Sequence, residues 1–230
     1  DRLGLGEPQL RAIKPDLIYL SASGLGRSGP QSTAVAYGTL LQCYAGFAAL
    51  SGHPQRPPRV GMAWLDPMCA LQLAFVVAAS LWRRAADGVG VRIDFSMVEA
   101  LLWTMAEPLL HAQLGAQGSE PRARGNASGH CAPHGVYRAA GDDAWLAIAV
   151  GTEQQWQGLC GLVPELASSA QLEFDERVEQ RDSIDAALAR WCALADPAAL
   201  HASLSGSQIP ASAVFGANDL HASAHLKARG

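Results

Sequence analysis

The sequence predicts an α/β fold in its first half and an α+β fold in its second half. In the first half, strand-like runs alternate with helix-like runs, which is typical of parallel strands joined by helices. In the second half, two strand-like runs flank a turn, and helix-like runs follow. Between the halves lies Gly115–Gly129, which is rich in Gly, Ser, Pro and Arg and has few apolar residues. This composition is typical of a linker, so we expect two units.

The composition excludes several classes of protein. The chain has 230 residues, of which 49% are hydrophobic and 17% charged, and this favours a large core over disorder. A net charge of −4 gives no reason to expect nucleic acid as a partner. The five cysteines are far apart and show no metal-binding spacing. We therefore expect no metal, reduced thiols and a cytoplasmic location, and the start of the chain shows no signal-peptide pattern.

The first elements lead to a glycine-rich turn and then to a helix. Residues 7–14 predict a short amphipathic helix, and Asp16–Ser23 predicts a buried strand. The turn GLGRSGP follows at residues 24–30. Small and apolar residues from Ala34 to Leu50 then predict a tightly packed helix, and the prolines between residues 51 and 64 predict a loop.

The glycines of this turn match the spacing of a dinucleotide-binding motif but not its structural context. Gly24, Gly26 and Gly29 follow a predicted strand with the spacing G-x-G-x-x-G. A dinucleotide site also needs a helix that begins inside the motif and an acid about 20 residues later. Here Pro30 follows the last glycine, and no acid occurs before Asp66. Two interpretations remain, a turn whose backbone N–H groups meet an anion and a plain turn at the end of a strand.

Asp66 stands at the start of a long apolar run. Asp followed by Pro67 predicts a helix start, with Asp66 as the N-cap and the proline in the first turn. The run Met68–Trp82 contains Gln72 and Ser80 and is too short for a comfortable membrane span, so it predicts a buried or half-buried core helix. On this pattern alone, Asp66 either caps the helix or carries chemistry at its N-terminus.

The first half closes with a second strand and helix. Arg83–Gly90 is polar and predicts a turn, and Gly90–Phe95 predicts a strand. Ser96, with a glutamate three residues later, forms a capping-box pattern. The helix that follows is expected to run from Met97 to about Leu114, with a kink at Pro108.

The second half predicts a hairpin and several helices. Two strand-like runs surround the turn at Gly141–Asp143. Thr152 is an expected N-cap, and the helix after it carries Trp156, Leu159 and Cys160 on one face. Further helices are expected at residues 182–194, 197–204 and 217–228, with a short strand at 209–215.

In this order, the motifs resemble those of the class III CoA-transferases, the CaiB/BaiF family, which also contains formyl-CoA transferases and α-methylacyl-CoA racemases. The resemblance covers nearly the whole chain. It rests on six stretches: LRAIKPDLIYLSASGLGRSGP, AYGTLLQCYAGFAALSG, WLDP, RRAADGVGVRIDFSMVEALL, RGNASGHCAPHGVYRAAGDDAWLAIAV and IPASAVFGANDLHASAHLKARG.

The resemblance implies a fold and an assembly. Family members are interlocked homodimers, and each subunit has a Rossmann-like large domain and a smaller α+β domain. Residues 1–97 are expected in the large domain, 98–121 in a helix and linker, 122–215 in the small domain, and 216–230 in the return to the large domain. Family chains are longer and begin with a CoA-binding segment, so this chain is expected to be truncated at both ends.

The resemblance also implies an activity, the transfer of CoA from an acyl-CoA to a free carboxylic acid with Asp66 as the nucleophile. A carboxylate can attack a thioester, form a mixed anhydride and then hold CoA as an aspartyl thioester, without a permanently bound cofactor. CoA contacts are expected from Gly24, Gly26 and Arg59, since a glycine-rich turn can present backbone N–H groups to an anion. Substrate contacts are expected from Tyr37, Trp64, Gly125, Asn126 and His134.

The stretch Gly125–His134 matches a mobile loop of the family that can cover the active site. Its Gly and Ser content is typical of a lid. Within it, His134 either contacts the substrate or ties down the turn before the next strand.

Two other functions stay open. A racemase or epimerase needs two acid–base groups on opposite faces of the α-carbon. In the family's racemases, a His-Asp pair stands where this chain has Tyr37-Gly38, so CoA transfer is favoured. The chain could also be a non-catalytic partner subunit of a heteromeric enzyme. The sequence does not identify the acids that are exchanged. We expect no membrane partner.

Overall fold

The structure is a computed structural model that describes residues 3–115 and 122–230. By its internal contacts, the chain divides into two compact units, Asp1–Gly125 and Asn126–Gly230. The expected linker Gly115–Gly129 spans this division, and residues 116–121 lie outside the described residues. Small sheets and helices in both units make the chain a mixed α/β protein. The assignment of these stretches to a large and a small domain stays a prediction.

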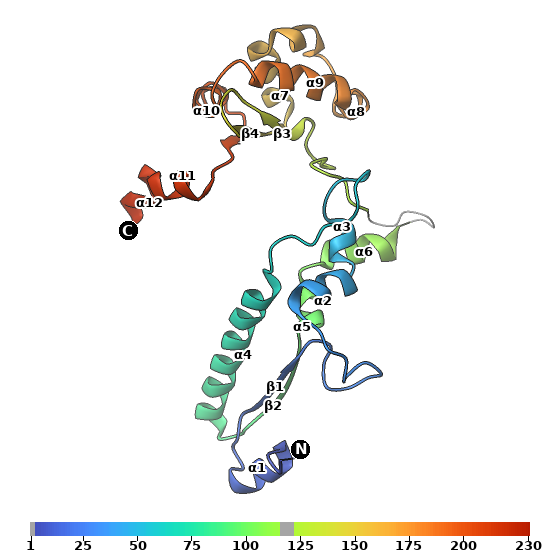
Figure 1. Cartoon of the computed structure of the whole chain (residues 1–230), viewed down its shortest axis with the longest axis vertical. Coiled ribbons are helices and arrows are strands. Elements are labelled where there is room, and N and C mark those ends of the chain that lie inside the picture. The colour runs from blue at the N-terminus through green and yellow to red at the C-terminus, as the bar shows by residue number, and fades with distance from the viewer. Residues whose placement is uncertain (1–2, 116–121) are drawn as a thin grey trace. The chain divides into compact units, whose positions relative to one another are not determined.

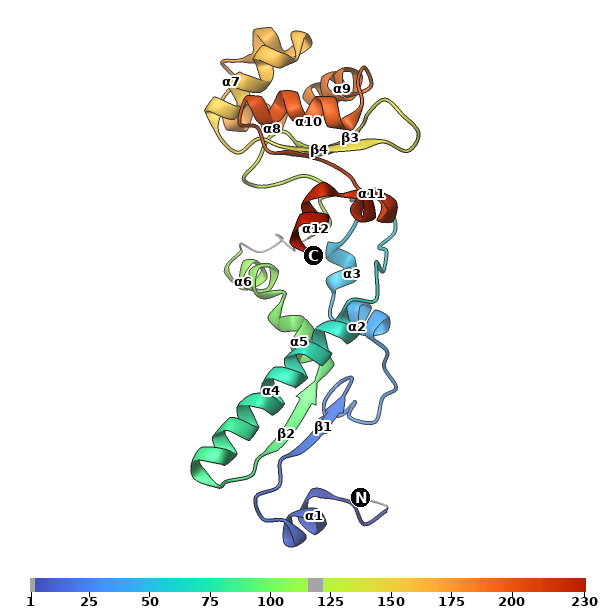
Figure 2. The same ribbon diagram turned by 90° about the vertical axis from the view of Figure 1, so that its left-hand side faces the viewer.

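Two parallel strands form the sheet of the first unit. They are β1 (Tyr19–Ser23) and β2 (Arg92–Ser96), and Tyr19 pairs with Arg92. Parallel neighbours need a crossover connection, and helix α4 (Leu65–Asp87) lies within it. Figures 1 and 2 both show α4 running beside the strand pair. Both predicted strands are confirmed, but β1 begins at Tyr19 rather than Asp16, and its predicted burial is wrong because its residues are half-buried or exposed.

The shorter helices of the first unit differ from prediction in two places. They are α1 (Glu7–Ile13), α2 (Gly38–Tyr44), α3 (Phe47–Leu50), α5 (Met97–Trp103) and α6 (Ala106–Leu114). The expected helix from Ala34 to Leu50 is wrong in its start and its continuity. It begins at Gly38, and Gly46 separates α2 from α3 with a left-handed φ of 83°.

The expected kink at Pro108 is likewise wrong, because the helix breaks earlier, at Thr104–Met105. A proline ring clashes with the carbonyl four residues before it, which here belongs to Thr104. Pro108 therefore lies in the first turn of α6, where its missing N–H leaves no helical hydrogen bond unmade. The predicted cap at Ser96 is confirmed, since its side chain accepts from the Glu99 N–H.

Helix α4 is longer than the sequence predicts. The expected turn Arg83–Gly90 is helical as far as Asp87, and Gly88 ends the helix with a φ of 71°. Of its 23 residues, only Leu65 and Cys69 are fully buried, and a half-buried face that includes Met68, Leu73 and Val77 continues along the helix. The half-buried form of the prediction is therefore confirmed, and full burial is limited to the first turns. Among the described residues, α4 is the one helix long and apolar enough to cross a membrane, and core helices of soluble proteins pass the same test.

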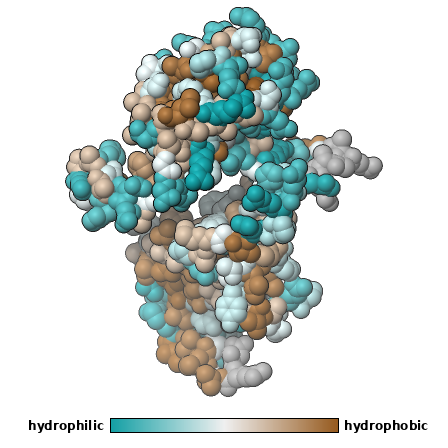
Figure 3. Space-filling model, turned by 45° about the horizontal axis from the view of Figure 1, so that its top comes forward, coloured by the Kyte–Doolittle hydropathy of each residue, from teal (hydrophilic) through white to brown (hydrophobic). Residues whose placement is uncertain are grey.

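The core of the first unit gathers where the start of α4 meets α2 and α5. Its buried members are Leu41, Leu65, Cys69, Val98, Ala100, Leu101 and Met105. This cluster fixes the first turn of α4, which carries Asp66. Figure 3 shows hydrophobic side chains gathered on the visible surface of the first unit, whereas the visible face of the second unit is mostly hydrophilic.

The second unit contains a three-stranded antiparallel sheet in the order β3-β4-β5. The strands are β3 (His134–Arg138), β4 (Trp145–Ala149) and β5 (Ala211–Ala213). The predicted hairpin at Gly141–Asp143 is confirmed by the pairing of β3 with β4. Helix α9 packs on β3 and α10 packs on β4 and β5, and Figure 2 shows these helices along one face of the sheet.

The helices of the second unit are α7 (Glu153–Leu162), α8 (Phe174–Glu179), α9 (Arg181–Cys192), α10 (Pro197–Gly206), α11 (Ala217–Ala222) and α12 (Ala224–Arg229). A 3₁₀ helix at Pro164–Ser169 and helix α8 were not predicted. The expected helix 217–228 is two helices, because Ser223 caps the second one. The Thr152 cap and the buried face of Trp156, Leu159 and Cys160 are confirmed.

Candidate active site

Asp66 is the second residue of α4. The predicted N-cap role is wrong, because the helix begins one residue earlier, at Leu65, and Trp64 occupies the cap position. The carboxylate therefore lies within the first turn. A negative charge is favoured there by the unpaired N–H groups and by the helix dipole.

A second helix start lies against the same carboxylate. Gly38 is the first residue of α2, and a Cβ built on it would lie 2.3 Å from Oδ1 of Asp66 and 2.8 Å from its Cγ. Any side chain at residue 38 would have to displace the carboxylate. Tyr37 precedes this glycine and is 68% exposed. Its expected place in a substrate cavity stays a prediction.

Two neighbours shape the surroundings of Asp66 within the first unit. Cys69 is buried, and its burial, together with the Asp66 charge, raises the pKa of its thiol. A protonated thiol is a poor nucleophile and does not compete with the carboxylate. Trp64 packs edge-on against Phe47, with ring centroids 5.2 Å apart at 62°. This contact holds the residue before α4 against the core, and a substrate contact of Trp64 stays a prediction.

Gln42 is a buried polar residue near this site that the sequence analysis missed. It is fully buried, and its Nε2 donates to the Met62 carbonyl at 3.4 Å. Among the described residues its Oε1 has no partner. Gln42 lies one helical turn after Gly38, on the same face of α2. It thus ties α2 to the segment that leads into Asp66. A single amide within an apolar helix was the only signal for it.

The glycine turn is shaped by packing. A Cβ on Gly24 would lie 2.5 Å from the Cβ of Ala36, and the Gly24 carbonyl accepts from the Val98 N–H at 3.0 Å. Gly26 has a φ of 86°, a conformation that favours glycine. These features fit a plain turn at the end of a strand. CoA contacts at Gly24 and Gly26, and at the exposed Arg59, stay predictions.

A cavity of about 390 Å³ opens on the sheet of the second unit. Its lining includes Asn126, His134, Val136, Ala147, Ala149 and Ser212. Strand residues alternate between the two faces, and the buried Tyr137 and Leu146, which do not line the cavity, belong to the core. The cavity therefore lies on the face opposite the packed helices and is largely apolar with a few polar groups.

His134 and Asn126 meet at the edge of this cavity. Nδ1 of His134 is hydrogen-bonded to the Asn126 backbone carbonyl, and a carbonyl can only accept. The bonded Nδ1 therefore carries a proton and donates it to this carbonyl. The structure thus brings two of the expected substrate residues together. Gly125 belongs to the first unit, where its N–H donates to the Gly52 carbonyl at 2.9 Å.

Residues 1–230 match the family described as CoA-transferase family III. The chain is 34% identical over 193 residues to the acetyl-CoA:oxalate CoA-transferase of Acetobacter aceti, covering 82% of this chain and 49% of that protein. It is 30% identical over 194 residues to the succinyl-CoA–L-malate CoA-transferase alpha subunit of Chloroflexus aurantiacus, covering 82% of this chain and 44% of that subunit. The chain thus spans about half the length of these curated relatives.

No group of three or more metal-ligating side chains occurs within residues 3–115 and 122–230.

A solved structure supports the sequence match. The crystal structure of a CAIB/BAIF family protein from Brucella suis superposes with a TM-score of 0.87 at 30% identity, covering 100% of this chain and 61% of that one. By sequence and by fold, the chain belongs to CoA-transferase family III, the CaiB/BaiF family.

Proposed function

We propose that this chain carries the nucleophile of an enzyme that moves CoA from an acyl-CoA thioester to a free carboxylic acid. The observation that carries the proposal is the Asp66 carboxylate, which lies in the first turn of α4 and against Gly38 at the start of α2. Family membership supplies the reaction class, since the similar proteins are named CoA-transferases. Their acids differ, so the acyl donor and the acceptor of this chain stay open.

The first half-reaction loads CoA onto the protein. A carboxylate oxygen of Asp66 attacks the thioester carbonyl carbon, and the C–S bond breaks to release the CoA thiolate. The product is a mixed anhydride between Asp66 and the acyl group. The thiolate then attacks the Asp66 carbonyl carbon of this anhydride. The donor acid leaves as a carboxylate, and CoA stays on Asp66 as a thioester.

The second half-reaction runs the same steps with the acceptor acid. Its carboxylate attacks the aspartyl thioester, releases the thiolate and forms a second anhydride. The thiolate then attacks the acceptor carbonyl, which yields the new acyl-CoA and restores the Asp66 carboxylate. Thioester and anhydride bonds are exchanged throughout, so neither ATP nor a metal ion is required.

The local structure suits this chemistry in two ways. Each attack passes through a tetrahedral oxyanion, and helix N-termini stabilise negative charge. The first turns of α4 and α2 both lie at Asp66. Because Gly38 has no side chain, the carboxylate can lie directly against the start of α2.

The wider assembly is part of the proposal. We propose the family's interlocked homodimer, with a Rossmann-like large domain to which the strand pair and α4 belong. Substrate contacts are assigned to Tyr37, Trp64, Gly125, Asn126 and His134, and CoA contacts to Gly24, Gly26 and Arg59. A heteromeric enzyme is a second candidate, because one similar protein is named an alpha subunit.

The test compares Asp66→Asn and Asp66→Ala with Asp87→Asn, a matched change at the other end of α4. Removal of a covalent nucleophile costs roughly a thousandfold or more in turnover. We expect that loss in both Asp66 variants, with little change in the unfolding midpoint of Asp66→Asn, and normal turnover in Asp87→Asn. CoA transfer that persists in Asp66→Asn, once deamidation is excluded, would contradict the proposal. Activity that appears only after a second subunit is added would favour the heteromer.

A further inference from the structure

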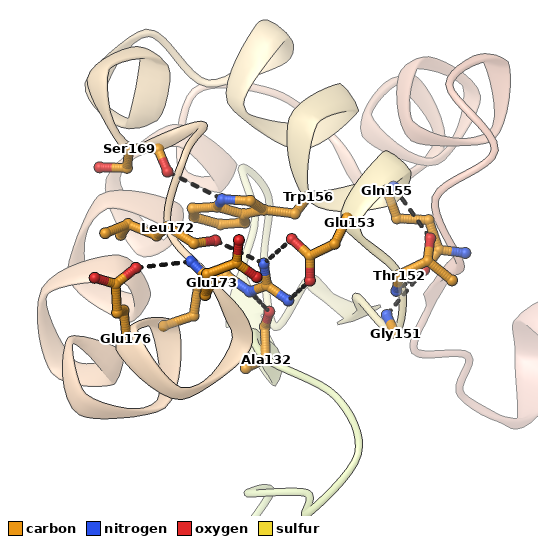
Figure 4. A network of polar contacts seen from close by, with 11 residues as sticks. Ala132, Gly151, Thr152, Glu153, Gln155, Trp156, Ser169, Leu172, Glu173 and Glu176 are labelled. Carbon is orange, nitrogen blue, oxygen red and sulfur yellow. Dashed lines mark hydrogen bonds and ion pairs between the residues drawn. The ribbon is translucent and has the colours of Figure 1, made fainter.

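A buried arginine joins three segments of the second unit. Arg177 on α8 has a side-chain exposure of 1%. Its Nη1 and Nη2 donate to the two carboxylate oxygens of Glu153 at 2.6 and 2.8 Å. Nη1 also donates to the Leu172 carbonyl at 2.9 Å, and Nε donates to the Ala132 carbonyl at 3.0 Å. Figure 4 shows Glu153, Leu172 and Ala132 converging on this network.

Aromatic rings flank the same guanidinium. Its central carbon lies 5.3 Å from the ring centroid of Trp156 and 5.8 Å from that of Phe174. The Trp156 indole N–H donates to the Ser169 carbonyl at 3.0 Å, which holds this ring in place. The site therefore fits a flat group with donors around its edge. A lysine ammonium is compact and cannot reproduce this fork.

The contact with Ala132 fixes one end of the segment that carries the cavity edge. Ala132 is 2% exposed, its N–H donates to the Val150 carbonyl at 2.9 Å, and its carbonyl accepts from Arg177. Two residues later, His134 begins β3 and is hydrogen-bonded back to the Asn126 carbonyl. Asn126 and His134 both line the cavity. The anchored end thus lies next to the two polar groups at the cavity edge.

A second arginine pair in the same unit shows what is particular to Arg177. Arg190 is paired with Glu165 and is 61% exposed, whereas Arg177 is 1% exposed; the two glutamates are about equally exposed, at 49% for Glu165 and 53% for Glu153. Arg190 contacts only this carboxylate in the described structure. Arg177 contacts a carboxylate and also two backbone carbonyls that belong to different segments. An arginine that served only charge pairing would not need these carbonyl contacts.

We propose that Arg177 is a positioning residue for the substrate site. By holding the Ala132 carbonyl, it keeps His134 bonded to Asn126 at the cavity edge, and this geometry sets the affinity for the carboxylic acid substrate. The kinetic consequence rests on the proposed CoA transfer. The geometric part does not, because it concerns only contacts within the second unit.

The experiment uses three single variants. Arg177→Lys keeps a positive charge beside Glu153 but loses the Ala132 contact. Glu153→Gln weakens the ion pair but leaves Nε of Arg177 on Ala132. Arg190→Lys alters the exposed pair and serves as the control. Two quantities are measured in each, the NMR signal of the His134 Nδ1 proton, assigned with His134→Gln, and the KM and kcat for the acid that accepts CoA.

We expect Arg177→Lys to lose the His134 proton signal and to raise the KM for the acid by about tenfold or more, since small displacements in a site cost up to about a hundredfold. Its kcat should change much less than its KM. Glu153→Gln and Arg190→Lys should keep the signal and the wild-type KM. Arg177→Lys and Glu153→Gln are both expected to lower the unfolding midpoint, so a change confined to Arg177→Lys is not a stability effect.

Several results would overturn the proposal. They are an intact proton signal in Arg177→Lys, a KM that rises equally in Glu153→Gln, and a lost signal with an unchanged KM. If wild-type protein shows no CoA transfer either alone or with a second family subunit added, the proposed function fails, and the proton signal still decides whether Arg177 holds the cavity edge. Should Arg177→Lys not fold, the double variant Arg177→Gln with Glu153→Gln removes both charges together and is tested in the same way.

Discussion

The Asp66 carboxylate occupies the space where a side chain at residue 38 would begin. This contact joins residues from two helices and therefore leaves no trace in the local pattern around either one. Asp66 is recognisable in the sequence through its motif, whereas Gly38 stands out only as the position where a racemase would carry an acid. The structure adds a physical reason for glycine at residue 38. A Cβ built there would lie 2.3 Å from Oδ1 of Asp66.

Gly38→Ala tests that reason. The new methyl group must displace the carboxylate, and because Asp66 is exposed and the atoms met are the end of its side chain, we expect little change in stability. We expect turnover to fall roughly a hundredfold, because the nucleophile is moved from its place. Gly161→Ala is the matched control, since a Cβ there meets nothing within 4 Å. It should leave activity unchanged. Steady-state kinetics of both variants decide the matter, and an active Gly38→Ala would contradict the close packing.

At the scale of secondary-structure elements, the Arg177–Glu153 pair links α8 to the first turn of α7. Glu153 receives two hydrogen bonds from the guanidinium, and these bonds lower the pKa of its carboxyl group. The folded protein therefore binds a proton at Glu153 less readily than the unfolded chain does. The resulting stability is present above the ordinary glutamate pKa of about 4.3 and is lost as the pH falls through the lower folded value.

The difference in stability between wild type and Glu153→Gln should show this dependence on pH. We expect wild-type protein to exceed the variant in free energy of unfolding at pH 7, and the difference to shrink as the pH is lowered below about 4. Denaturant titrations at stepped pH measure it. Glu165→Gln is the control, because the exposed Glu165–Arg190 pair should contribute less. A difference between wild type and Glu153→Gln that does not change with pH would contradict the role of this pair.

Elements whose signals are local were predicted well, and those set by distant contacts were not. The hairpin at Gly141–Asp143 and the Thr152 cap follow from turn and capping residues, and both are confirmed. The break before α6 was misplaced, because the clash caused by Pro108 acts four residues upstream. The burial of Arg177 could not be predicted, since α8 is polar and its partners Ala132 and Glu153 lie far along the chain.

At the scale of the whole chain, α4 leaves a row of large apolar side chains uncovered. Leu71, Phe75 and Trp82 are 74%, 74% and 82% exposed. Their spacing places them along one face of the helix. Exposed apolar surface of this kind marks an interface or a tendency to associate. The chain also spans about half the length of its curated relatives.

We therefore expect the isolated 230-residue chain to self-associate at tens of micromolar. Replacing Leu71, Phe75 and Trp82 together by glutamine should reduce that association. Leu194→Gln is the matched control, because Leu194 is 81% exposed and lies in the second unit. Light scattering after size exclusion gives the mass. A monomeric isolated chain, or equal effects of both changes, would contradict a role for this face of α4.

Labelled oxygen tests whether Asp66 becomes covalently linked to the substrates. The acceptor acid is supplied with both carboxyl oxygens as ¹⁸O, and the enzyme is recovered after turnover. When the second anhydride collapses, the oxygen that bridged it stays on Asp66. The tryptic peptide Val60–Arg83, which contains Asp66, should therefore gain ¹⁸O by mass spectrometry, and it should gain none without acyl-CoA. Active enzyme whose Asp66 peptide stays unlabelled would contradict the mechanism, because direct transfer between the two substrates leaves no label on the protein.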